Sequence, residues 1–230
     1  MVALDVDSLG RARALARQLR GAAGLVKVGS QLFTAEGPRV VKMLAGEGFG
    51  VFLDLKFHDI PSTVAAAVMA AAELPQVRLL TLHALGGAGM LEAASAALSK
   101  KKRRPAVLGV TLLTSMDETT LRGVEIAGPP DQTVLALAKL AQQAGLDGVV
   151  ASGQEARAIR AQCGPRFLVV TPGVRPQSAR ANDQSRITTP SEAIEAGADY
   201  LVVGRPITEA DDPHTAARAI AREIALARRA

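Results

Sequence analysis

The chain has 230 residues, with 27 Lys and Arg against 22 Asp and Glu, one Cys, and 48% hydrophobic but only 3% aromatic residues. This length allows a full core without disulfides, and a single domain is expected because α/β barrels commonly take about 200–250 residues. Cys163 has no cysteine partner, the first residues are acidic, and no apolar run reaches membrane-spanning length, so we expect a cytoplasmic protein rather than a secreted or membrane one.

The net charge of +5 and the pI near 9.8 raise the question of nucleic-acid binding, which depends on cations that neutralise phosphates. One Tyr, five Phe and no Trp leave few platforms for stacking bases, and the sequence contains no nucleic-acid-binding motif. The dense basic run from Lys100 to Arg104 follows a helix-like segment, so we interpret it as a solvated helix C-terminus. We therefore expect no nucleic-acid partner.

Short runs of β-branched and aliphatic residues alternate with longer Ala-, Leu- and Arg-rich segments, which is typical of βα units. The expected strands are Val2–Val6, Leu25–Val28, Val51–Leu55, Leu79–His83, Ala106–Leu112, Gly148–Ala151, Phe167–Thr171 and Tyr200–Val203. Helices are expected to follow, among them Leu9–Arg20, Ser62–Glu73, Met90–Ser99, Thr133–Ala144, Glu155–Gln162 and Thr215–Arg228. This alternation, without a linker in residues 1–230, predicts one α/β domain, a (β/α)₈ TIM barrel, with an open doubly wound sheet as the alternative.

Charged residues stand at the ends of the first three strands, where buried strands ordinarily carry aliphatic residues. Because side chains alternate across a strand, Asp54 and Lys56 share the face opposite their apolar neighbours. The same parity directs Asp5 and Lys27 into the barrel. Buried charges persist when they are paired or when function requires them, so this cluster predicts an active site, with a purely structural ion-pair network as the alternative.

Two features near the C-terminus suit an anionic ligand. Residues 172–189 lack a helical or strand pattern, and a loop of this length predicts a lid over an active site. Gly204 and Arg205 follow the last strand, where backbone N–H groups and a guanidinium can bind phosphate. Barrels often hold phosphate at the loops after strands seven and eight. A plain helix start with a solvated arginine is the alternative.

The segment Asp54–Thr63, Asp-Leu-Lys-Phe-His-Asp-Ile-Pro-Ser-Thr, resembles the signature of the orotidine 5′-monophosphate decarboxylase family, specifically its bacterial branch. The resemblance extends along nearly the whole chain, through Ala3–Asp5, Lys27–Gly29, His83–Ala84, Val110–Ser115, Thr171–Arg175, Asp183–Gln184 and Val203–Thr208. It implies decarboxylation of orotidine 5′-monophosphate to uridine 5′-monophosphate, the last step of de novo pyrimidine nucleotide synthesis. It also implies a homodimer that needs no cofactor.

The resemblance implies roles for individual residues. Lys56 would stabilise and protonate the C6 carbanion, within a catalytic set that comprises Asp54, Lys56, Asp59 and Lys27. The substrate-binding set would comprise Asp5, Lys27, Ile60, Thr63, Thr114, Arg175, Gln184, Gly204 and Arg205. Of these, Asp5 and Lys27 would bind ribose hydroxyls and Thr114 the pyrimidine, whereas Arg175, Gln184, Gly204 and Arg205 would bind the 5′-phosphate.

Some of these residues have competing interpretations. The resemblance implies that Asp59, with Ile60 and Thr63, serves the site of the partner subunit, yet Asp59 lies just before Pro61 and its carboxylate could cap a helix. Ser115 is an alternative ring contact to Thr114. The run from Ser115 to Glu118 is also typical of a helix capping box.

The nearest alternative activity is that of a magnesium-dependent sugar-phosphate decarboxylase or aldolase of the same superfamily. Those relatives need an additional carboxylate near the position of Lys27, and His58, His83 and His214 are scattered, so we expect no metal site. A Schiff-base aldolase is disfavoured because flanking carboxylates keep a lysine in its charged form.

Overall fold

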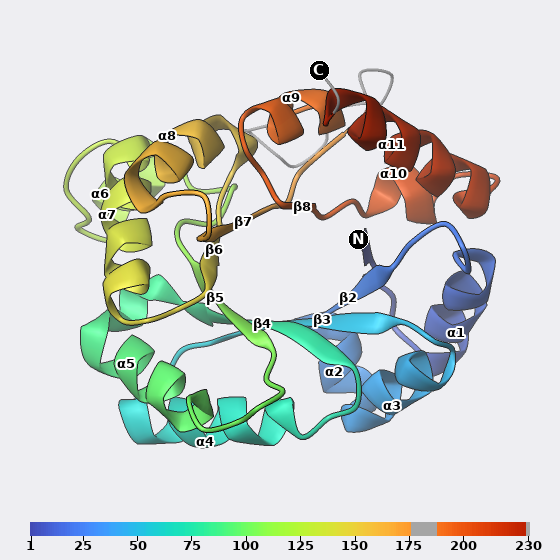
Figure 1. Ribbon diagram of the computed structural model, residues 1–230, viewed down its shortest axis with the longest axis horizontal. Coiled ribbons are helices and arrows are strands. Elements are labelled where there is room, and N and C mark those ends of the chain that lie inside the picture. The colour runs from blue at the N-terminus through green and yellow to red at the C-terminus, as the bar shows by residue number, and fades with distance from the viewer. Residues whose placement is uncertain (176–187, 229–230) are drawn as a thin grey trace.

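The computed structural model describes residues 1–175 and 188–228. One sheet of parallel strands runs in chain order through β1 (Val2–Ala3), β2 (Leu25–Gly29), β3 (Gly50–Phe57), β4 (Val77–His83), β5 (Ala106–Val110), β6 (Gly148–Val150), β7 (Leu168–Thr171) and β8 (Tyr200–Leu201). The sheet closes on itself because the N–H of Ala3 donates to the carbonyl of Val203 at 2.9 Å, and the N–H of Val203 donates to the carbonyl of Met1 at 3.1 Å. The expected barrel is confirmed (Figure 1).

Helices surround the barrel on its outside (Figure 1). They are α1 (Leu9–Gln18), α2 (Ser30–Glu36), α3 (Pro38–Gly46), α4 (Pro61–Ala72), η1 (Ala84–Gly86, a 3₁₀ turn), α5 (Gly87–Leu98), α6 (Glu118–Gly123), α7 (Pro130–Gln143), α8 (Gly153–Cys163), α9 (Pro190–Glu195), α10 (Arg205–Thr208) and α11 (Pro213–Ala227). Every helix named from the sequence is present, with bounds within three residues of those expected.

The sequence did not single out several short helices. Between β2 and β3, Gly37 at φ 59° and Pro38 divide the segment into α2 and α3, with 7 and 9 residues. Helices this short carry too few apolar positions to display a clear period. The strand bounds also differ: β1 ends at Ala3 instead of Val6, because only Val2 and Ala3 pair with β2.

Two apolar clusters hold the barrel together. The larger one fills the layer between the sheet and the helices, and the buried positions of α7, namely Val134, Leu137, Ala138 and Ala141, show the helical spacing that faces it. The smaller one fills the barrel interior with Ala3, Phe52, Leu79, Leu108, Val110, Val150, Val170 and Val202. Phe52 points into the barrel interior, and because residues two apart on a strand share a face, Asp54 on β3 points inward as well.

Two aspartates fasten strands at the end of the barrel where the strands begin. Asp147 accepts hydrogen bonds from Arg104 and from the N–H of Val107 at 2.8 Å. Asp199 accepts from Arg160 Nη2 at 2.7 Å and from the N–H of Val169 at 2.7 Å. Each carboxylate therefore joins a side-chain cation to the start of a neighbouring strand.

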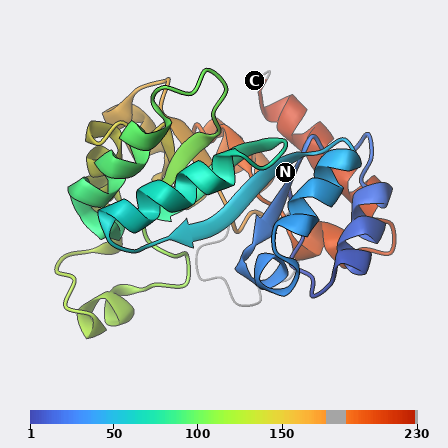
Figure 2. The same ribbon diagram turned by 90° about the horizontal axis from the view of Figure 1, so that it is seen from below.

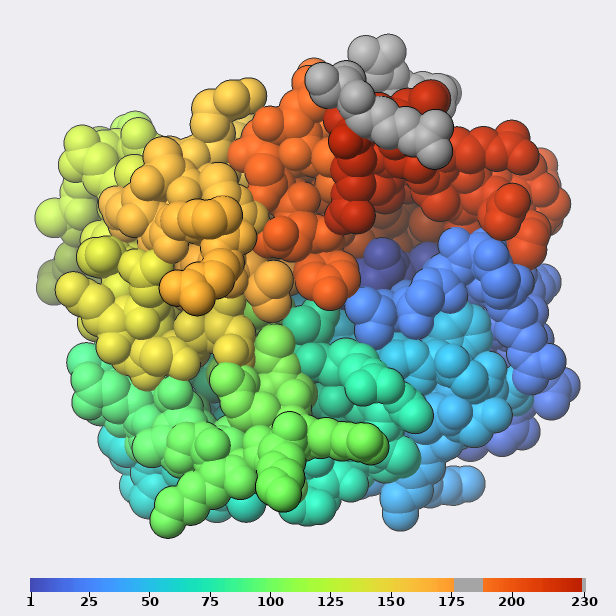
Figure 3. Space-filling model, in the orientation of Figure 1, coloured from blue at the N-terminus to red at the C-terminus, as the bar shows by residue number. Residues whose placement is uncertain are grey.

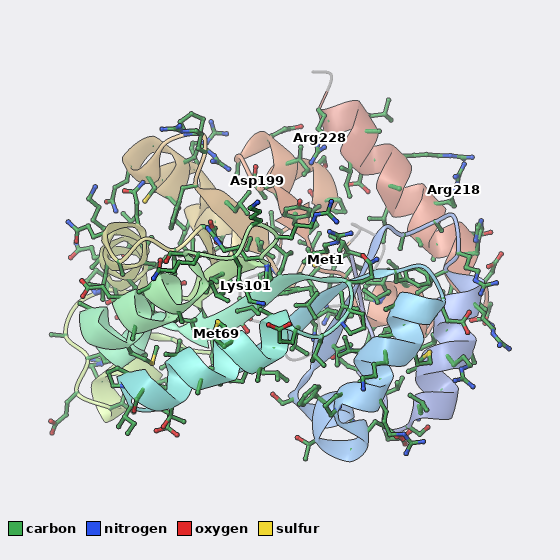
Figure 4. All side chains as sticks on the ribbon, turned by 60° about the horizontal axis from the view of Figure 1, so that its bottom comes forward. Met1, Met69, Lys101, Asp199, Arg218 and Arg228 are labelled. Carbon is green, nitrogen blue, oxygen red and sulfur yellow. The ribbon has the colours of Figure 1, made fainter. Side chains whose placement is uncertain are left out.

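Figure 4 shows the end of α11 against this region, with Arg228 near Asp199. The guanidinium of Arg228 donates to the Asp199 carbonyl at 3.1 Å. The basic run Lys100–Arg104 does follow a helix end, because α5 stops at Leu98, but it is not wholly solvated: Lys101 pairs with Glu73 and Arg104 with Asp147.

The face seen in Figure 3 is hollowed beside the dark-blue N-terminus. An apolar cavity of about 210 Å³ lies there, lined mainly by Met1, Ala22, Leu201, Ile220 and Ile224. Within residues 1–175 and 188–228, no helix is long and apolar enough to cross a membrane.

We expect Asp199→Ala to lower the free energy of unfolding by about 1–3 kcal/mol, because it removes the ion pair with the partly buried Arg160, which retains carbonyl acceptors, and takes the carboxylate acceptor from the N–H of Val169. Urea unfolding measures this loss. The control is Asp7→Ala, which removes a mostly exposed i,i+4 pair with Arg11 and should cost about 0.5 kcal/mol or less. Equal losses in the two variants would contradict the role given to Asp199.

Candidate active site

The parallel strands deliver their charged residues to one end of the barrel. β1, β2 and β3 are neighbours in the sheet, so Asp5, Lys27, Asp54 and Lys56 meet where these strands end. Figure 2 shows the segment that carries α6 projecting from this side of the barrel, toward which the arrow of β3 points. The inward orientation predicted for these four side chains is confirmed by their contacts.

The carboxylate of Asp54 is the centre of this cluster. Asp54 is 7% exposed, and its Oδ2 lies 2.8 Å from Lys56 Nζ and 3.7 Å from Lys27 Nζ. Lys27 Nζ also lies 2.8 Å from Asp5 Oδ1, so the chain of charges alternates in sign from Asp5 to Lys56. This alternation offsets the cost of removing Asp54 from water.

The backbone at Lys56 is unusual. Lys56 has φ 51°, a left-handed conformation that costs a non-glycine residue about 1–3 kcal/mol. The pairing of β3 with β4 shifts register between Leu53 and Phe57, so the regular ladder is interrupted at this point. The N–H of Lys56 donates instead to Thr81 Oγ1 at 2.9 Å, and Thr81 Oγ1 donates to Asp54 Oδ1 at 3.0 Å. No sequence pattern indicates a role for Thr81, because its contacts depend on this irregularity.

Two adjoining cavities open at the cluster, and Lys27, Asp54, Pro172 and Val202 line both of them. The first, of about 410 Å³, is mainly polar and includes Asp5, Gly173, Arg175, Gly204 and Arg205. The second, of about 290 Å³, is mainly apolar and includes Phe52, Lys56, Val110, Leu112, Thr114, Ser115 and Val150. The site therefore offers one compartment for an anionic, hydroxyl-rich group and one for a flat group with apolar faces.

Other residues from the sequence predictions lie elsewhere. Asp59, Ile60 and Thr63 are exposed on the loop after β3 and at the start of α4, outside both cavities. Gln184 lies outside the described residues, as does most of the expected lid 172–189. At the two described ends of that segment, the N–H of Arg175 donates to the carbonyl of Thr188 at 3.1 Å.

Both capping interpretations are wrong. Asp59 accepts from the N–H of Ile60 at 2.6 Å, but Ile60 is the N-cap of α4 and no side chain caps that helix. The expected capping box at Ser115 is absent because Asp117 caps α6, accepting from the N–H of Thr120 at 2.8 Å. Asp117 lies closer to the first turn of α6 and takes the position that the pattern assigned to Ser115.

His83 lies beside the cluster, at the end of β4. Its ring centroid is 5.5 Å from that of His58, and its Nδ1 is buried with no hydrogen-bond partner among the described residues. Burial lowers the pKa of His83 below its ordinary value, His58 and Lys56 lower the pKa further, and Asp54 opposes them. In residues 1–175 and 188–228, no three His, Cys, Asp or Glu side chains gather as a potential metal site.

Comparison with known proteins identifies the family of this chain. A family model described as "Orotidine 5'-phosphate decarboxylase / HUMPS family" matches residues 1–220. The chain belongs to this family. Relatives named orotidine 5′-phosphate decarboxylase from Nitrosococcus oceani and Halorhodospira halophila are each 54% identical, covering 97% and 99% of this chain and 96% of either relative. The resemblance inferred from the sequence is confirmed.

Solved structures agree with the barrel. The crystal structure of orotidine 5′-phosphate decarboxylase from Lactobacillus acidophilus has a TM-score of 0.86 at 40% identity, and the match covers 97% of each chain. The family's decarboxylase from Methanocaldococcus jannaschii, solved with the inhibitor BMP, has a TM-score of 0.77 at 21% identity and covers 97% of each chain. The second likeness concerns the fold alone.

The lowered pKa of His83 predicts a pH-dependent contribution to stability. The unfolded state, with an ordinary His pKa of about 6.5, binds more protons on acidification than the folded state. This contribution is therefore fully present above about pH 6.5 and is lost as the pH falls toward the folded-state pKa. We expect the melting temperature of His83→Gln to fall less than that of the unaltered protein between about pH 7.5 and pH 5.5.

The control is His214→Gln, which removes an exposed imidazole on α11. The difference between His83→Gln and the unaltered protein should exceed the difference between His214→Gln and the unaltered protein. Thermal scans at matched ionic strength measure all three proteins. A fall in His83→Gln as large as in the unaltered protein would contradict the prediction.

Proposed function

We propose that orotidine 5′-phosphate binds in the two adjoining cavities and that Lys56 protonates the carbon from which CO₂ departs. As a member of its family, the chain catalyses decarboxylation of orotidine 5′-phosphate to uridine 5′-phosphate in pyrimidine nucleotide synthesis. The observation that carries the proposed site is the pair of buried Asp54 and partly buried Lys56, 2.8 Å apart: Asp54 lines both the polar and the apolar compartment, and Lys56 lines the apolar one.

The polar compartment suits the ribose 5′-phosphate. Arg175, Gly204 and Arg205 line it, and guanidinium groups with backbone N–H donors match phosphate oxygens. Asp5 and Lys27 lie on the side nearer Asp54, where they can bind ribose hydroxyls as acceptor and donor. We assign Gln184 to the phosphate on the resemblance alone, because it lies outside the described residues.

The apolar compartment suits the pyrimidine. Aliphatic walls from Val110, Leu112 and Val150 can cover the faces of the ring, while Thr114 or Ser115 can hydrogen-bond to its edge. Both residues line the cavity, so both stay candidates for this contact. We propose that C6 of the ring then faces Lys56, which lines the same cavity.

In the proposed reaction, the bond between C6 and the carboxylate carbon breaks, CO₂ leaves, and the electron pair remains on C6. The ammonium of Lys56 stabilises this developing negative charge and transfers a proton to C6, after which Lys56 regains a proton from solvent. Asp54 holds the ammonium at 2.8 Å and, as a buried carboxylate, disfavours the nearby carboxylate of the bound substrate more than the neutral CO₂ that leaves.

We propose a homodimer in which Asp59 and Thr63 complete the site of the partner subunit. Within the described residues, Asp59 forms no ion pair with Lys56 of its own chain, and its hydrogen bond is to Ile60. Ile60, Leu85 and Leu113 are 63%, 40% and 38% exposed and follow the adjacent strands β3, β4 and β5, which gives this rim apolar surface to bury. The cytoplasmic location expected from the sequence also stays a proposal.

The alternative activity is that of a magnesium-dependent sugar-phosphate lyase, since the family description includes the HUMPS group. Lys27 stands where that chemistry needs a carboxylate, and its ammonium disfavours a divalent cation beside Asp54. The relatives that are about half identical to this chain carry the decarboxylase name. We therefore favour orotidine 5′-phosphate.

We expect Lys56→Ala to lower kcat by at least about 10⁴-fold while retaining most of the affinity for uridine 5′-phosphate, because the variant loses the cation and proton donor but keeps the phosphate and ribose contacts. A spectrophotometric assay of orotidine 5′-phosphate loss with EDTA present measures turnover, and calorimetry measures product binding.

The matched control is Lys42→Ala, an exposed lysine on α3, which should retain full activity. Decarboxylation by Lys56→Ala at the normal rate would exclude the proposed role. No turnover by the unaltered protein in EDTA, together with activity on a sugar phosphate after magnesium is added, would favour the lyase instead.

Mixing Lys56→Ala with Asp59→Ala tests the shared site. Each variant alone should be nearly inactive. If Asp59 acts in the partner's site, a heterodimer holds one site with both residues intact, so an equal mixture after subunit exchange should recover about a quarter of normal activity. Activity that stays at the level of the separate variants would show that Asp59 acts within its own subunit.

A further inference from the structure

Thr81 is a buried hydroxyl in contact with the Asp54–Lys56 pair. It lies on β4 between Leu79 and His83, on the side that faces the barrel interior, and it is 0% exposed. Its Oγ1 donates to Asp54 Oδ1 at 3.0 Å and accepts from the N–H of Lys56 at 2.9 Å. One hydroxyl thus contacts the side chain of one member of the pair and the backbone of the other.

These two bonds constrain each other. A threonine hydroxyl has one proton to donate, so the bond to Asp54 directs that proton toward the carboxylate and leaves an oxygen lone pair for the N–H of Lys56. The bond to Lys56 lies where the β3–β4 ladder is irregular, so it satisfies a backbone donor at the residue held at φ 51°. Thr81 therefore supports both the carboxylate orientation and the backbone turn that places the ammonium.

We propose that the Thr81 hydroxyl is a positioning group that sets the orientation of the Asp54 carboxylate and the Lys56 ammonium for proton transfer. This inference rests on the proposed function of Lys56. Asp54 presents Oδ2 to the ammonium at 2.8 Å, and Thr81 occupies Oδ1, so rotation of the carboxylate away from this geometry breaks the bond to Thr81.

The experiment compares Thr81→Val with Thr81→Ser. Valine fills nearly the same volume but leaves Asp54 Oδ1 and the N–H of Lys56 without this partner, whereas serine keeps the hydroxyl. We expect Thr81→Val to lower kcat by about 10- to 100-fold, the effect of misplacing a reacting group by a fraction of an ångström to an ångström. KM and the affinity for uridine 5′-phosphate should stay within about threefold. Thr81→Ser should restore kcat to within about fivefold of normal.

The control is Thr111→Val. Thr111, the residue after β5, is also 0% exposed. Its hydroxyl donates to the carbonyl of Val150 at 3.0 Å. Thr111→Val also loses a buried hydroxyl hydrogen bond, but this bond involves neither Asp54 nor Lys56. Its kcat should therefore stay close to normal. Thr81→Cys, with a weak thiol donor, replaces Thr81→Val if the valine variant does not fold, and its expected kcat lies between those of the serine variant and Lys56→Ala.

A kcat in Thr81→Val equal to that of the unaltered protein overturns the inference. So does an equal loss in the serine and valine variants, or a rise in KM with kcat unchanged. An equal loss in Thr111→Val shows a general effect of lost buried hydrogen bonds and also overturns it. When the unaltered protein is active and Lys56→Ala is not, these outcomes reject the role of Thr81 and leave the proposed function in place.

Discussion

A carboxylate held almost entirely out of water is the constraint around which the barrel mouth is built. Asp54 is 7% exposed, and an isolated ion in such a place costs several kcal/mol. Lys56, Lys27 and the Thr81 hydroxyl offset that cost from three neighbouring strands. Strand order, inward parity and the irregular end of β3 are all needed to bring these groups to one carboxylate. The same interactions hold the ammonium of Lys56 against Asp54, which lines both cavities, and at the wall of the apolar one.

The division of the site into a polar and an apolar compartment has an energetic meaning for the proposed reaction. Contacts to the phosphate and ribose do not change as the carbon–carbon bond breaks, so their binding energy can hold the reacting ring beside unfavourable charge. In the proposed complex, the apolar walls around the ring would exclude water and so strengthen the interaction between the ammonium and the charge that develops on C6. Neither compartment would serve the reaction without the other.

The sequence predicted much of this arrangement, and the exceptions have physical reasons. Strand parity placed Asp5, Lys27, Asp54 and Lys56 inside the barrel because alternation along a strand needs no tertiary information. The left-handed φ of Lys56 and its bond to Thr81 arise from a register shift between two strands, which no local pattern records. The short helices α2 and α3 were not predicted because each has too few apolar positions to show a helical period. The prediction of a capping box at Ser115 was wrong because Asp117 caps the same helix. The role proposed for Asp59 requires a second chain, which the pattern of one sequence does not describe.

The seam between the first and last strands links chain closure to ligand occupancy. Only a few backbone hydrogen bonds join Met1 and Ala3 to Val203, yet the residues just beyond them, Asp5 on one side and Arg205 on the other, line the same cavity. A nucleotide that contacts both residues therefore bridges the two ends of the sheet. By mass action, such a ligand would stabilise the closed barrel by a free energy that grows with the logarithm of its concentration above Kd. The concentration of the nucleotide would therefore affect the folding equilibrium as well as the occupancy of the active site.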